Sequence, residues 1–291
     1  MRRVWLGIVA SIILASLSFA PAQAANETNR GLFVTPVREY VSVAPGTTAQ
    51  KQVTIANITD NPVAVSLSVE RFSVADYSYD YTFSADTEKW LQLSETQVEL
   101  QPGKSKAVTY TAAPPANTTP GGHYFTIFAT ATVQNGSVKS QVRAATVVYA
   151  TVEGELKVGT ALQNISIPRV SFGGDIDFSM DVTATGNTHF FIYVAGELEG
   201  LTSKGRGTES TRLLMPGATL KVGSTIPAPL LPGVYKAVYG YKTDSGETVE
   251  RWSHVVYVPL WSLVIPVGIV WLVVAFIRRR GQVVRFRTKD S

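Results

Sequence analysis

Residues 52–69, QVTIANITDNPVAVSLSV, decide the fold class of this chain. Apolar and polar residues alternate in 52–55 and again in 63–69, which is the period-two pattern of strands with one buried face. Between them, residues 57–62 are rich in Asn, Asp and Pro, the residue types that favour turns. The stretch therefore predicts a hairpin of two half-buried strands.

The same pattern of short alternating runs continues along the chain. Further runs follow at residues 90–93, 107–111, 123–133 and 138–152, and no amphipathic helix pattern occurs between residues 25 and 257. Many short strands at roughly ten-residue spacing, separated by turn residues, are typical of antiparallel β-sandwiches. We therefore expect the central part of the chain to be all-β.

An internal repeat divides this β-rich part in two. A Pro-Gly pair precedes a strand twice in each half, at Pro102-Gly103 and Pro120-Gly121 and again at Pro216-Gly217 and Pro232-Gly233. Each half also has an earlier Gly before a strand that ends in an Asn turn, Gly46 to Asn57 and Gly174 to Asn187. We interpret residues 25–154 and 155–257 as two related immunoglobulin-like β-sandwich domains in tandem.

A hydrophobic run of 20 residues, 258–277, follows the second repeat and carries no charged residue. A helix of about 20 residues at about 1.5 Å per residue is about 30 Å long, which matches the hydrocarbon core of a bilayer. The alternative is a buried core helix, but such helices rarely stay uncharged over this length. We expect a C-terminal transmembrane helix.

The start of the chain sets the orientation of this helix. Arg2 and Arg3 precede an apolar stretch that ends in Ala22-Gln23-Ala24, a small-x-small cleavage pattern, so residues 1–24 read as a signal peptide. Residues 278–291 hold six basic residues and should stay in the cytoplasm by the positive-inside rule. The expected protein is a single-pass protein of the plasma membrane with an extracytoplasmic ectodomain.

Charge and cysteine content exclude several functions. Of 26 Lys and Arg residues, two lie in the leader and six in the tail, and Asp290 is the one of 22 acidic residues outside the ectodomain, so the ectodomain carries a net charge of −3. That charge argues against nucleic acid as a partner. The chain has no cysteine, which excludes disulfides and thiolate nucleophiles.

Enzyme signals are also poor. His123, His189 and His254 lie far apart in the sequence, and no nucleophile elbow or phosphate-binding loop is present. We expect no catalytic residue, no cofactor and no metal site, and therefore a protein that is not an enzyme.

One segment distinguishes the first repeat from the second. Residues 75–90, ADYSYDYTFSADTEKW, make the first repeat longer and combine aromatic with acidic residues. Alternation would place Tyr77, Tyr79 and Tyr81 on one face of a strand. They either cover the sheet or form, with their neighbours, a surface that contacts a ligand or partner. The predicted contact residues are Asp76, Tyr77, Tyr79, Asp80, Tyr81 and Phe83. The acidic residues of this segment lack the spacing of a calcium loop, so a solvated rim is the favoured interpretation.

Several motifs resemble a known family. They are Val43-Ala44-Pro45-Gly46, Val53-Thr54-Ile55-Ala56-Asn57, Trp90-Leu91-Gln92-Leu93 and Thr119-Pro120-Gly121-Gly122-His123-Tyr124. They are similar to the N-terminal domain of bacterial WxL-interacting cell-surface proteins. The resemblance implies an immunoglobulin-like, peptidoglycan-binding domain, a second sandwich, a membrane span and a basic tail.

Two functions remain open at this point. The first is a membrane-anchored surface protein whose ectodomain binds an extracellular polymer or a partner protein, with cell-wall peptidoglycan implied by the resemblance. The second is a chaperone-like or assembly factor that accepts a strand from another polypeptide at an open sandwich edge.

Overall fold

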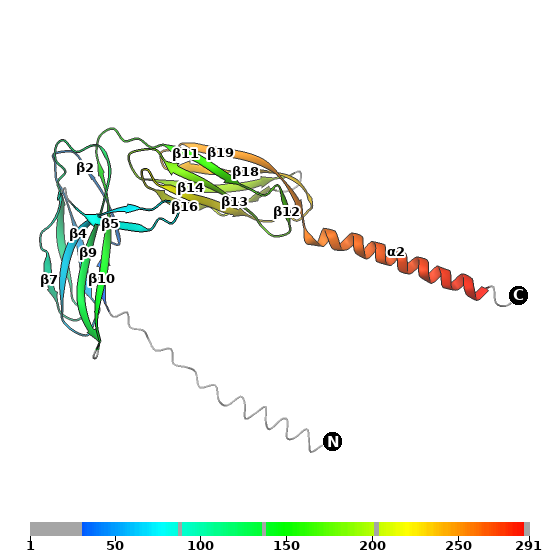
Figure 1. Ribbon diagram of the computed structural model, residues 1–291, viewed down its shortest axis with the longest axis horizontal. Coiled ribbons are helices and arrows are strands. Elements are labelled where there is room, and N and C mark those ends of the chain that lie inside the picture. The colour runs from blue at the N-terminus through cyan, green and yellow to red at the C-terminus, as the bar shows by residue number, and fades with distance from the viewer. Residues whose placement is uncertain (1–30, 87–88, 136–137, 201–203, 288–291) are drawn as a thin grey trace, which may run out of the picture.

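The computed structural model describes residues 31–86, 89–135, 138–200 and 204–287. Within these residues, every element from Leu32 to Val258 is a β-strand, and the last element is the helix α2 (Leu260–Arg287). Figure 1 shows two elongated sandwiches that meet at a corner, with α2 extending from the far end of the second one. The structure thus confirms the all-β class and the two sandwiches.

The first sandwich is built from two sheets. In order across the first sheet lie β1 (Leu32–Thr35), β3 (Ala49–Asn57), β8 (Ser105–Ala112) and β6 (Leu91–Leu93). The second sheet has the order β2 (Arg38–Val43), β10 (Val138–Val152), β9 (Gly121–Asn135), β4 (Val63–Val74) and β5 (Tyr81–Ala85), with β7 (Gln97–Leu100) also paired to β4.

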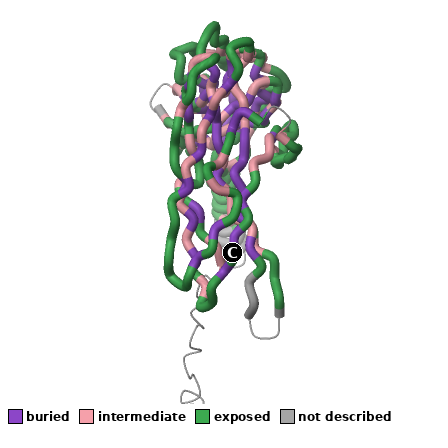
Figure 2. Tube along the Cα trace, turned by 90° about the vertical axis from the view of Figure 1, so that its left-hand side faces the viewer, coloured by how far each residue is buried: buried purple, intermediate pink, exposed green. Residues whose placement is uncertain are grey.

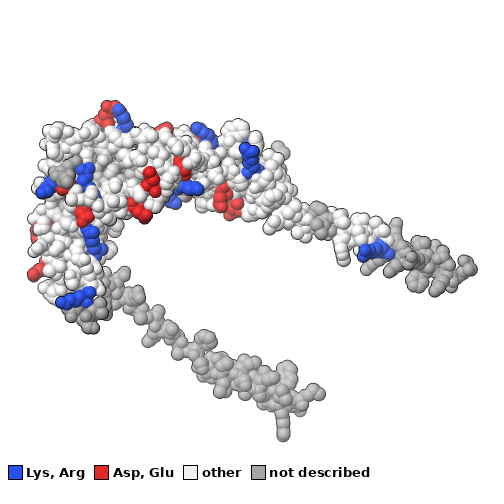
Figure 3. Space-filling view, viewed as in Figure 1, with Lys and Arg blue, Asp and Glu red and all other residues white. Residues whose placement is uncertain are grey.

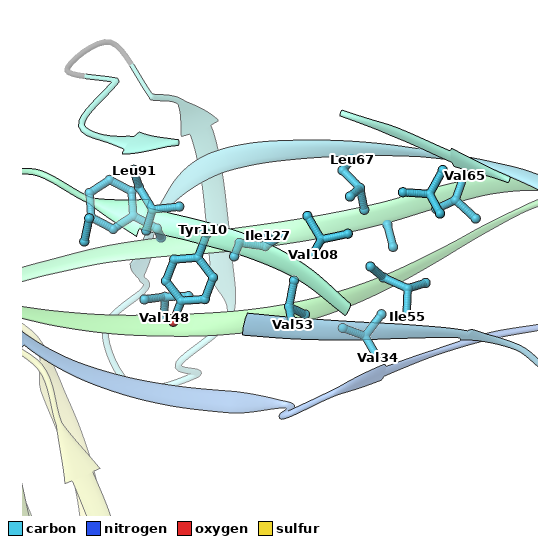
Figure 4. Close-up of a cluster of buried hydrophobic side chains, with 14 of the residues drawn as sticks. Val34, Val53, Ile55, Val65, Leu67, Leu91, Val108, Tyr110, Ile127 and Val148 are labelled. Atoms are coloured by element: carbon cyan, nitrogen blue, oxygen red, sulfur yellow. The ribbon is translucent and has the colours of Figure 1, made fainter. Parts of the chain in front are cut away.

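The hairpin predicted for residues 52–69 is wrong, because its two strands belong to opposite sheets. Strand β3 pairs with β1 and β8, whereas β4 pairs with β9, β5 and β7. Both strands have an apolar face, and these faces meet across the core, where Val53 and Ile55 of β3 lie with Val65 and Leu67 of β4 in one buried cluster (Figure 4). Face-to-face packing of two sheets buries more apolar surface than a hairpin edge would.

The second sandwich repeats this arrangement with its own core. One sheet has the order β11 (Thr160–Ser166), β13 (Ile176–Ala184) and β17 (Thr219–Ile226). The other has the order β12 (Val170–Phe172), β19 (Thr248–Val258), β18 (Gly233–Thr243), β14 (Phe190–Glu199) and β15 (Lys204–Arg206), with β16 (Ser210–Leu214) on β14. In Figure 2, where the side of the molecule with the first sandwich faces the viewer, buried chain runs along the interior and exposed chain lies around it.

Strand order therefore relates the two halves element by element. Strand β10 corresponds to β19, β9 to β18, β4 to β14 and β2 to β12. The predicted insert, residues 75–90, is only partly extra, because its strand β5 corresponds to β15. Strand β6, which follows it, has no counterpart among the described residues of the second sandwich.

Asn57 fixes the turn that carries the chain from β3 to β4. Its side chain is fully buried and donates to the carbonyl oxygens of Asn61 (2.8 Å) and Leu100 (3.0 Å). Its Oδ1 accepts from the backbone N–H of Thr59 (2.9 Å) and from the Thr59 hydroxyl (2.6 Å). A buried amide with all these partners stabilises the turn, since each partner would otherwise lose a hydrogen bond.

Replacing Asn57 by Ala should lower the free energy of unfolding by about 2–3 kcal/mol, because buried donors and acceptors lose their partners. Denaturant titration of the whole chain checks this. The control is Gln52→Ala on the exposed face of β3, for which we expect a change within about 0.5 kcal/mol. Equal effects of the two substitutions would contradict the role assigned to Asn57.

Candidate functional site: an open strand edge and the corner between the sandwiches

Half of strand β10 has a partner on only one side. It pairs with β9 along its whole length, from Val138 to Val152, but with β2 only from Val147 to Val152. No described strand pairs with its outer edge between Val138 and Thr146. An unpaired edge presents a row of backbone donors and acceptors to any strand that can reach it.

The first strand creates this open edge by changing sheets. Strand β1 pairs with β3 in one sheet. The chain then crosses to the other sheet at Pro36 and Val37, and from Arg38 onward β2 runs parallel to β10. The departure point is fixed by two hydrogen bonds, from the Val147 N–H to the Val37 carbonyl (2.9 Å) and from the Thr146 hydroxyl to the Pro36 carbonyl (2.7 Å).

The register shows which backbone groups face outward. Because the Val147 N–H points to β2, and because direction alternates along a strand, the N–H and C=O groups of Gln141, Arg143 and Ala145 point to the same edge. Intervening residues such as Val142 point to β9. The open half can therefore form ladder hydrogen bonds through alternate residues only.

The side chains of the open half separate into two rows. Val142 and Ala144 are half-buried and pack against the core of the first sandwich, as does Leu32 of β1. Lys139, Gln141 and Arg143 are exposed, and Arg143 forms an ion pair with Glu70 and lies 3.3 Å above the centre of the Phe128 ring. An added strand would meet apolar side chains on its inner face and polar ones on its outer face.

The corresponding edge of the second sandwich is different. Strand β19 pairs with β12 only from Val256 to Val258, so its outer edge is also without a described strand partner from Thr248 to Val255. Its inward positions there are Val249, which is half-buried against the second core, exposed Arg251, Ser253 and buried Val255. An inward-pointing charge is a common protection against strand addition. The described inward positions of the open half of β10 (Ser140, Val142, Ala144 and Thr146) include no charged residue, so the two edges differ by the charge at Arg251.

An aromatic cluster holds the two sandwiches together at the corner. Tyr149 of β10 stacks on Tyr40 of β2 with ring centroids 5.1 Å apart. From the second sandwich, His189 lies 5.2 Å from Tyr149, 5.6 Å from Tyr124 and 5.8 Å from Tyr40. Burial in this cluster lowers the pKa of His189 and raises the pKa values of Tyr124 and Tyr149. The uncharged forms are therefore favoured here.

Asn187 connects the linker to both sandwiches. Its side-chain amide donates to the carbonyls of Pro120 (3.1 Å) and Glu155 (2.9 Å), and its Oδ1 accepts from the Lys157 N–H (2.7 Å). Its own carbonyl accepts from the Gly122 N–H (2.8 Å). Asn187 thus occupies the position in the second repeat that Asn57 has in the first, but it fixes the hinge between the sandwiches.

The loop before β5 forms a clamp on the second sandwich. Asp76 accepts a hydrogen bond from the Thr219 N–H (2.7 Å), and the Tyr77 N–H donates to the Thr219 carbonyl (2.8 Å). The Tyr79 hydroxyl accepts from the Met215 N–H (3.0 Å). Burial raises the pKa of Tyr79, although the hydrogen bond with Met215 opposes that effect. Three of the predicted contact residues therefore bind the second sandwich.

The predicted row of tyrosines on one strand face is wrong. Tyr77 and Tyr79 lie in a turn with φ values of 63° and 57°, and only Tyr81 belongs to β5. Left-handed backbone conformations cannot continue a strand, so the alternation of the sequence has no structural counterpart here.

The remaining predicted contact residues lie on or next to β5. Asp80, Tyr81 and Phe83 are exposed. The Tyr81 and Phe83 rings lie 6.2 Å apart, and Phe83 packs edge-on against Phe128 at 5.0 Å. These residues stay a predicted contact surface. Trp90, at the end of the segment, is a core residue against Phe125 at 4.7 Å.

Among the described residues, no group of His, Asp or Glu side chains is placed to hold a metal ion. His123 lies against Trp90 at 5.5 Å and His254 against Trp252 at 5.4 Å, whereas His189 lies among the tyrosines of the corner. The three histidines are thus separate, and each packs against aromatic rings.

The chain thus has the architecture of two immunoglobulin-like sandwiches in tandem, and comparison with known proteins gives matches to solved structures only. No protein-family model and no curated protein matches the chain. The chaperone–tip adhesin complex of CFA/I fimbriae is similar with a TM-score of 0.44 and 9% identity, over 77% of this chain and 98% of that one. The class 5 fimbriae chaperone CfaA has a TM-score of 0.44 and 11% identity, over 79% of this chain and 100% of that one. The E. coli chaperone DraB has a TM-score of 0.37 and 11% identity, over 77% and 98%.

These matches correct the family resemblance. Assignment to the WxL-interacting surface proteins is wrong, since the similar structures are described as fimbrial chaperones and no family model matches the chain. Pro-Gly before a strand and Asn at the next turn reflect the sandwich fold itself, which explains why they suggested another family of that fold. The expectation of a protein that is not an enzyme agrees with the matches.

The clamp should set the geometry of the corner. Combining Asp76→Ala with Tyr79→Phe removes two hydrogen-bond acceptors for the second sandwich, so the angle between the sandwiches should vary more widely. Because the chain has no cysteine, spin labels on Lys51→Cys and Lys221→Cys can report their separation by pulsed electron resonance. We expect a broader distance distribution in the double variant. Tyr81→Phe, whose hydroxyl lies 3.5 Å from that of Tyr149, is the control and should leave the distribution unchanged.

Proposed function

We propose that this chain is a non-enzymatic, chaperone-like binding protein that accepts a strand of a partner polypeptide along the open half of β10. One observation carries the proposal, namely that residues 138–146 combine an unpaired backbone edge with half-buried Val142 and Ala144. An exposed apolar edge strand favours association unless something covers it. Strand addition would satisfy the backbone groups and bury both side chains together.

Other edges of the first sandwich are less suited to this role. All five residues of β5 are exposed, so this strand has no half-buried row that continues the core. Strand β6 has only three residues. The open half of β10 is longer, and its inner row continues the core. The partner strand should therefore alternate, with apolar residues facing Val142 and Ala144 and polar residues beside Gln141 and Arg143.

The anchoring of the protein is part of the proposal. We infer that α2 spans the plasma membrane and that the ectodomain is extracytoplasmic. Its segment from Leu260 to Arg278 is long and apolar enough for a span, and it is not buried against the sandwiches. Figure 3 shows charges of both signs over the sandwiches and an uncharged first part of α2. The predicted signal peptide, residues 1–24, lies outside the described residues, as does most of the side-chain detail of the basic tail.

A second candidate surface is the exposed part of the insert. Tyr81 and Phe83 keep 42% and 40% of their surface exposed although both belong to a strand. Aromatic side chains of this kind are common anchors in protein interfaces. Strands β5 and β10 lie toward opposite ends of the same sheet, separated by β4 and β9. Substitutions in one of them can therefore be compared with substitutions in the other in a single experiment.

Proline at position 141 should abolish strand addition. The Gln141 N–H points to the open edge, so Gln141→Pro removes one ladder donor and its ring blocks the approach of a strand, while pairing with β9 is kept. The measurement is the affinity of the whole chain for ten-residue peptides that alternate Val or Ile with Ser or Thr. We expect binding to the wild type and a loss of about tenfold or more in the variant.

Two matched variants complete this experiment. Gln141→Ala keeps the N–H and should bind like the wild type. Tyr81→Ser with Phe83→Ser should also bind normally if the edge of β10 is the site, and weakly if the insert is. Equal binding by Gln141→Pro and wild type would reject the β10 proposal.

The protected edge of β19 gives a converse prediction. Replacing Arg251 by Val and Ser253 by Ala removes the inward charge that protects this edge, so the second sandwich should become a strand acceptor too. Calorimetric titration with the same peptides should then give two binding sites per chain instead of one. A single site in the double variant would mean that inward charge does not distinguish the two edges.

A further inference from the structure

An exposed apolar patch covers the end of the second sandwich from which α2 emerges. Six large apolar side chains are exposed there, and a contiguous exposed apolar patch of this kind is uncommon on a soluble protein surface unless it is an interaction site. They are Val170, Phe172, Leu230, Leu231, Val234 and Val256, and Leu230 alone keeps 85% of its surface exposed.

Strand register makes this patch continuous. Val234 of β18 pairs with Val256 of β19, and Val256 pairs in turn with Val170 of β12. These three side chains point outward in one row across three neighbouring strands. Phe172 lies on the same face as Val170, two residues further along β12 and opposite Val258.

The loop that presents Leu230 and Leu231 is held in place. The Tyr235 hydroxyl donates to the Leu231 carbonyl (2.8 Å), and Asp175 accepts from the Ala228 N–H (2.9 Å). Since both ends of the loop are bonded to the sandwich, its two leucines stay directed outward. Their exposure belongs to the folded structure.

The patch is joined directly to α2. Only Pro259, which is buried, separates the end of β19 from Leu260. The Ser262 hydroxyl and N–H both donate to the Pro259 carbonyl (2.7 and 2.9 Å), and the Gly173 N–H donates to the Val258 carbonyl (3.0 Å). A side chain on Gly173 would lie 2.9 Å from Leu260, so the start of the helix packs against the turn after β12. In Figure 1, β12 lies beside this start.

We propose that this patch docks into the interfacial layer of the membrane that α2 spans. The inference rests on the proposed anchoring. Val256 precedes Val258 by two residues, which is about 7 Å along a strand, so Val256 and its register partners Val234 and Val170 lie at the depth of the roughly 5–8 Å headgroup layer next to the helix entry. Trp261, exposed in the first turn of α2, is a residue type that prefers this layer. Lipid contact therefore covers the patch and fixes the orientation of the second sandwich on the membrane.

Single-cysteine spin labels test this directly, because the wild-type chain has no cysteine. The full chain, labelled at Leu230→Cys, is reconstituted in vesicles of phosphatidylcholine and phosphatidylglycerol. Collision rates with oxygen, which enters lipid, and with a water-soluble nickel chelate are then compared. We expect the oxygen-to-nickel ratio to be several-fold higher for Leu230→Cys than for Lys242→Cys, an exposed position at the other end of β18.

A third label, Val270→Cys in the middle of α2, separates the two proposals. A lipid-like ratio at Val270 with a water-like ratio at Leu230 leaves the span in place and rejects docking. Lipid-like behaviour at Leu230 with water-like behaviour at Val270 supports docking and rejects the span. A label at Leu230 that neither reagent reaches would mean contact with another protein chain, which also rejects docking to lipid.

Discussion

The structure depends on the point at which the first strand leaves β10. Two hydrogen bonds, from Val147 to Val37 and from Thr146 to Pro36, mark the end of parallel pairing. On the N-terminal side of that point, β1 forms the edge strand of the opposite sheet. Residues 32–43 therefore contribute one strand to each of the two sheets. As a result, β10 is paired with β2 from Val147 to Val152, while its edge from Val138 to Thr146 is left without a described strand partner. Any strand-accepting function of the first sandwich follows from this division.

The repeat provides an internal comparison that a single domain would lack. The larger sheets of the two sandwiches have the same strand order and the same half-open last strand, so topology alone cannot assign the function. The difference lies in the inward side chains: the open half of β10 has Val142 and Ala144 there, whereas β19 places the charged Arg251 between Val249 and Ser253. Covering the first pair with a partner strand is favourable, whereas covering Arg251 would desolvate a charge. In the proposed function, one fold thus supports one receptive edge and one protected edge.

Local patterns in the sequence predicted the elements well but not their partners. Alternation identified β3 and β4, and the Pro-Gly and Asn signals identified the tandem repeat. The sequence could not show that β3 and β4 lie in opposite sheets, because alternation marks a buried face without saying what covers it. The prediction that the tyrosines of the insert share one strand face was wrong for a related reason. Backbone conformations with positive φ at Tyr77 and Tyr79 depend on contacts with Thr219 and Met215, more than 130 residues away.

The corner and the end from which α2 emerges together determine how the open edge would be presented. Asp76, Tyr79 and Asn187 bond the first sandwich to the second at its far end, while Pro259 and the turn at Gly173 join the second sandwich to α2 with almost no linker. A chain fixed at both joints loses little further conformational freedom when a partner binds, so more of the interaction energy remains as affinity. If α2 spans a membrane as proposed, the edge of β10 is held away from it, on the sandwich that α2 does not contact (Figure 1). A partner strand could approach it without competing with lipid for the same surface.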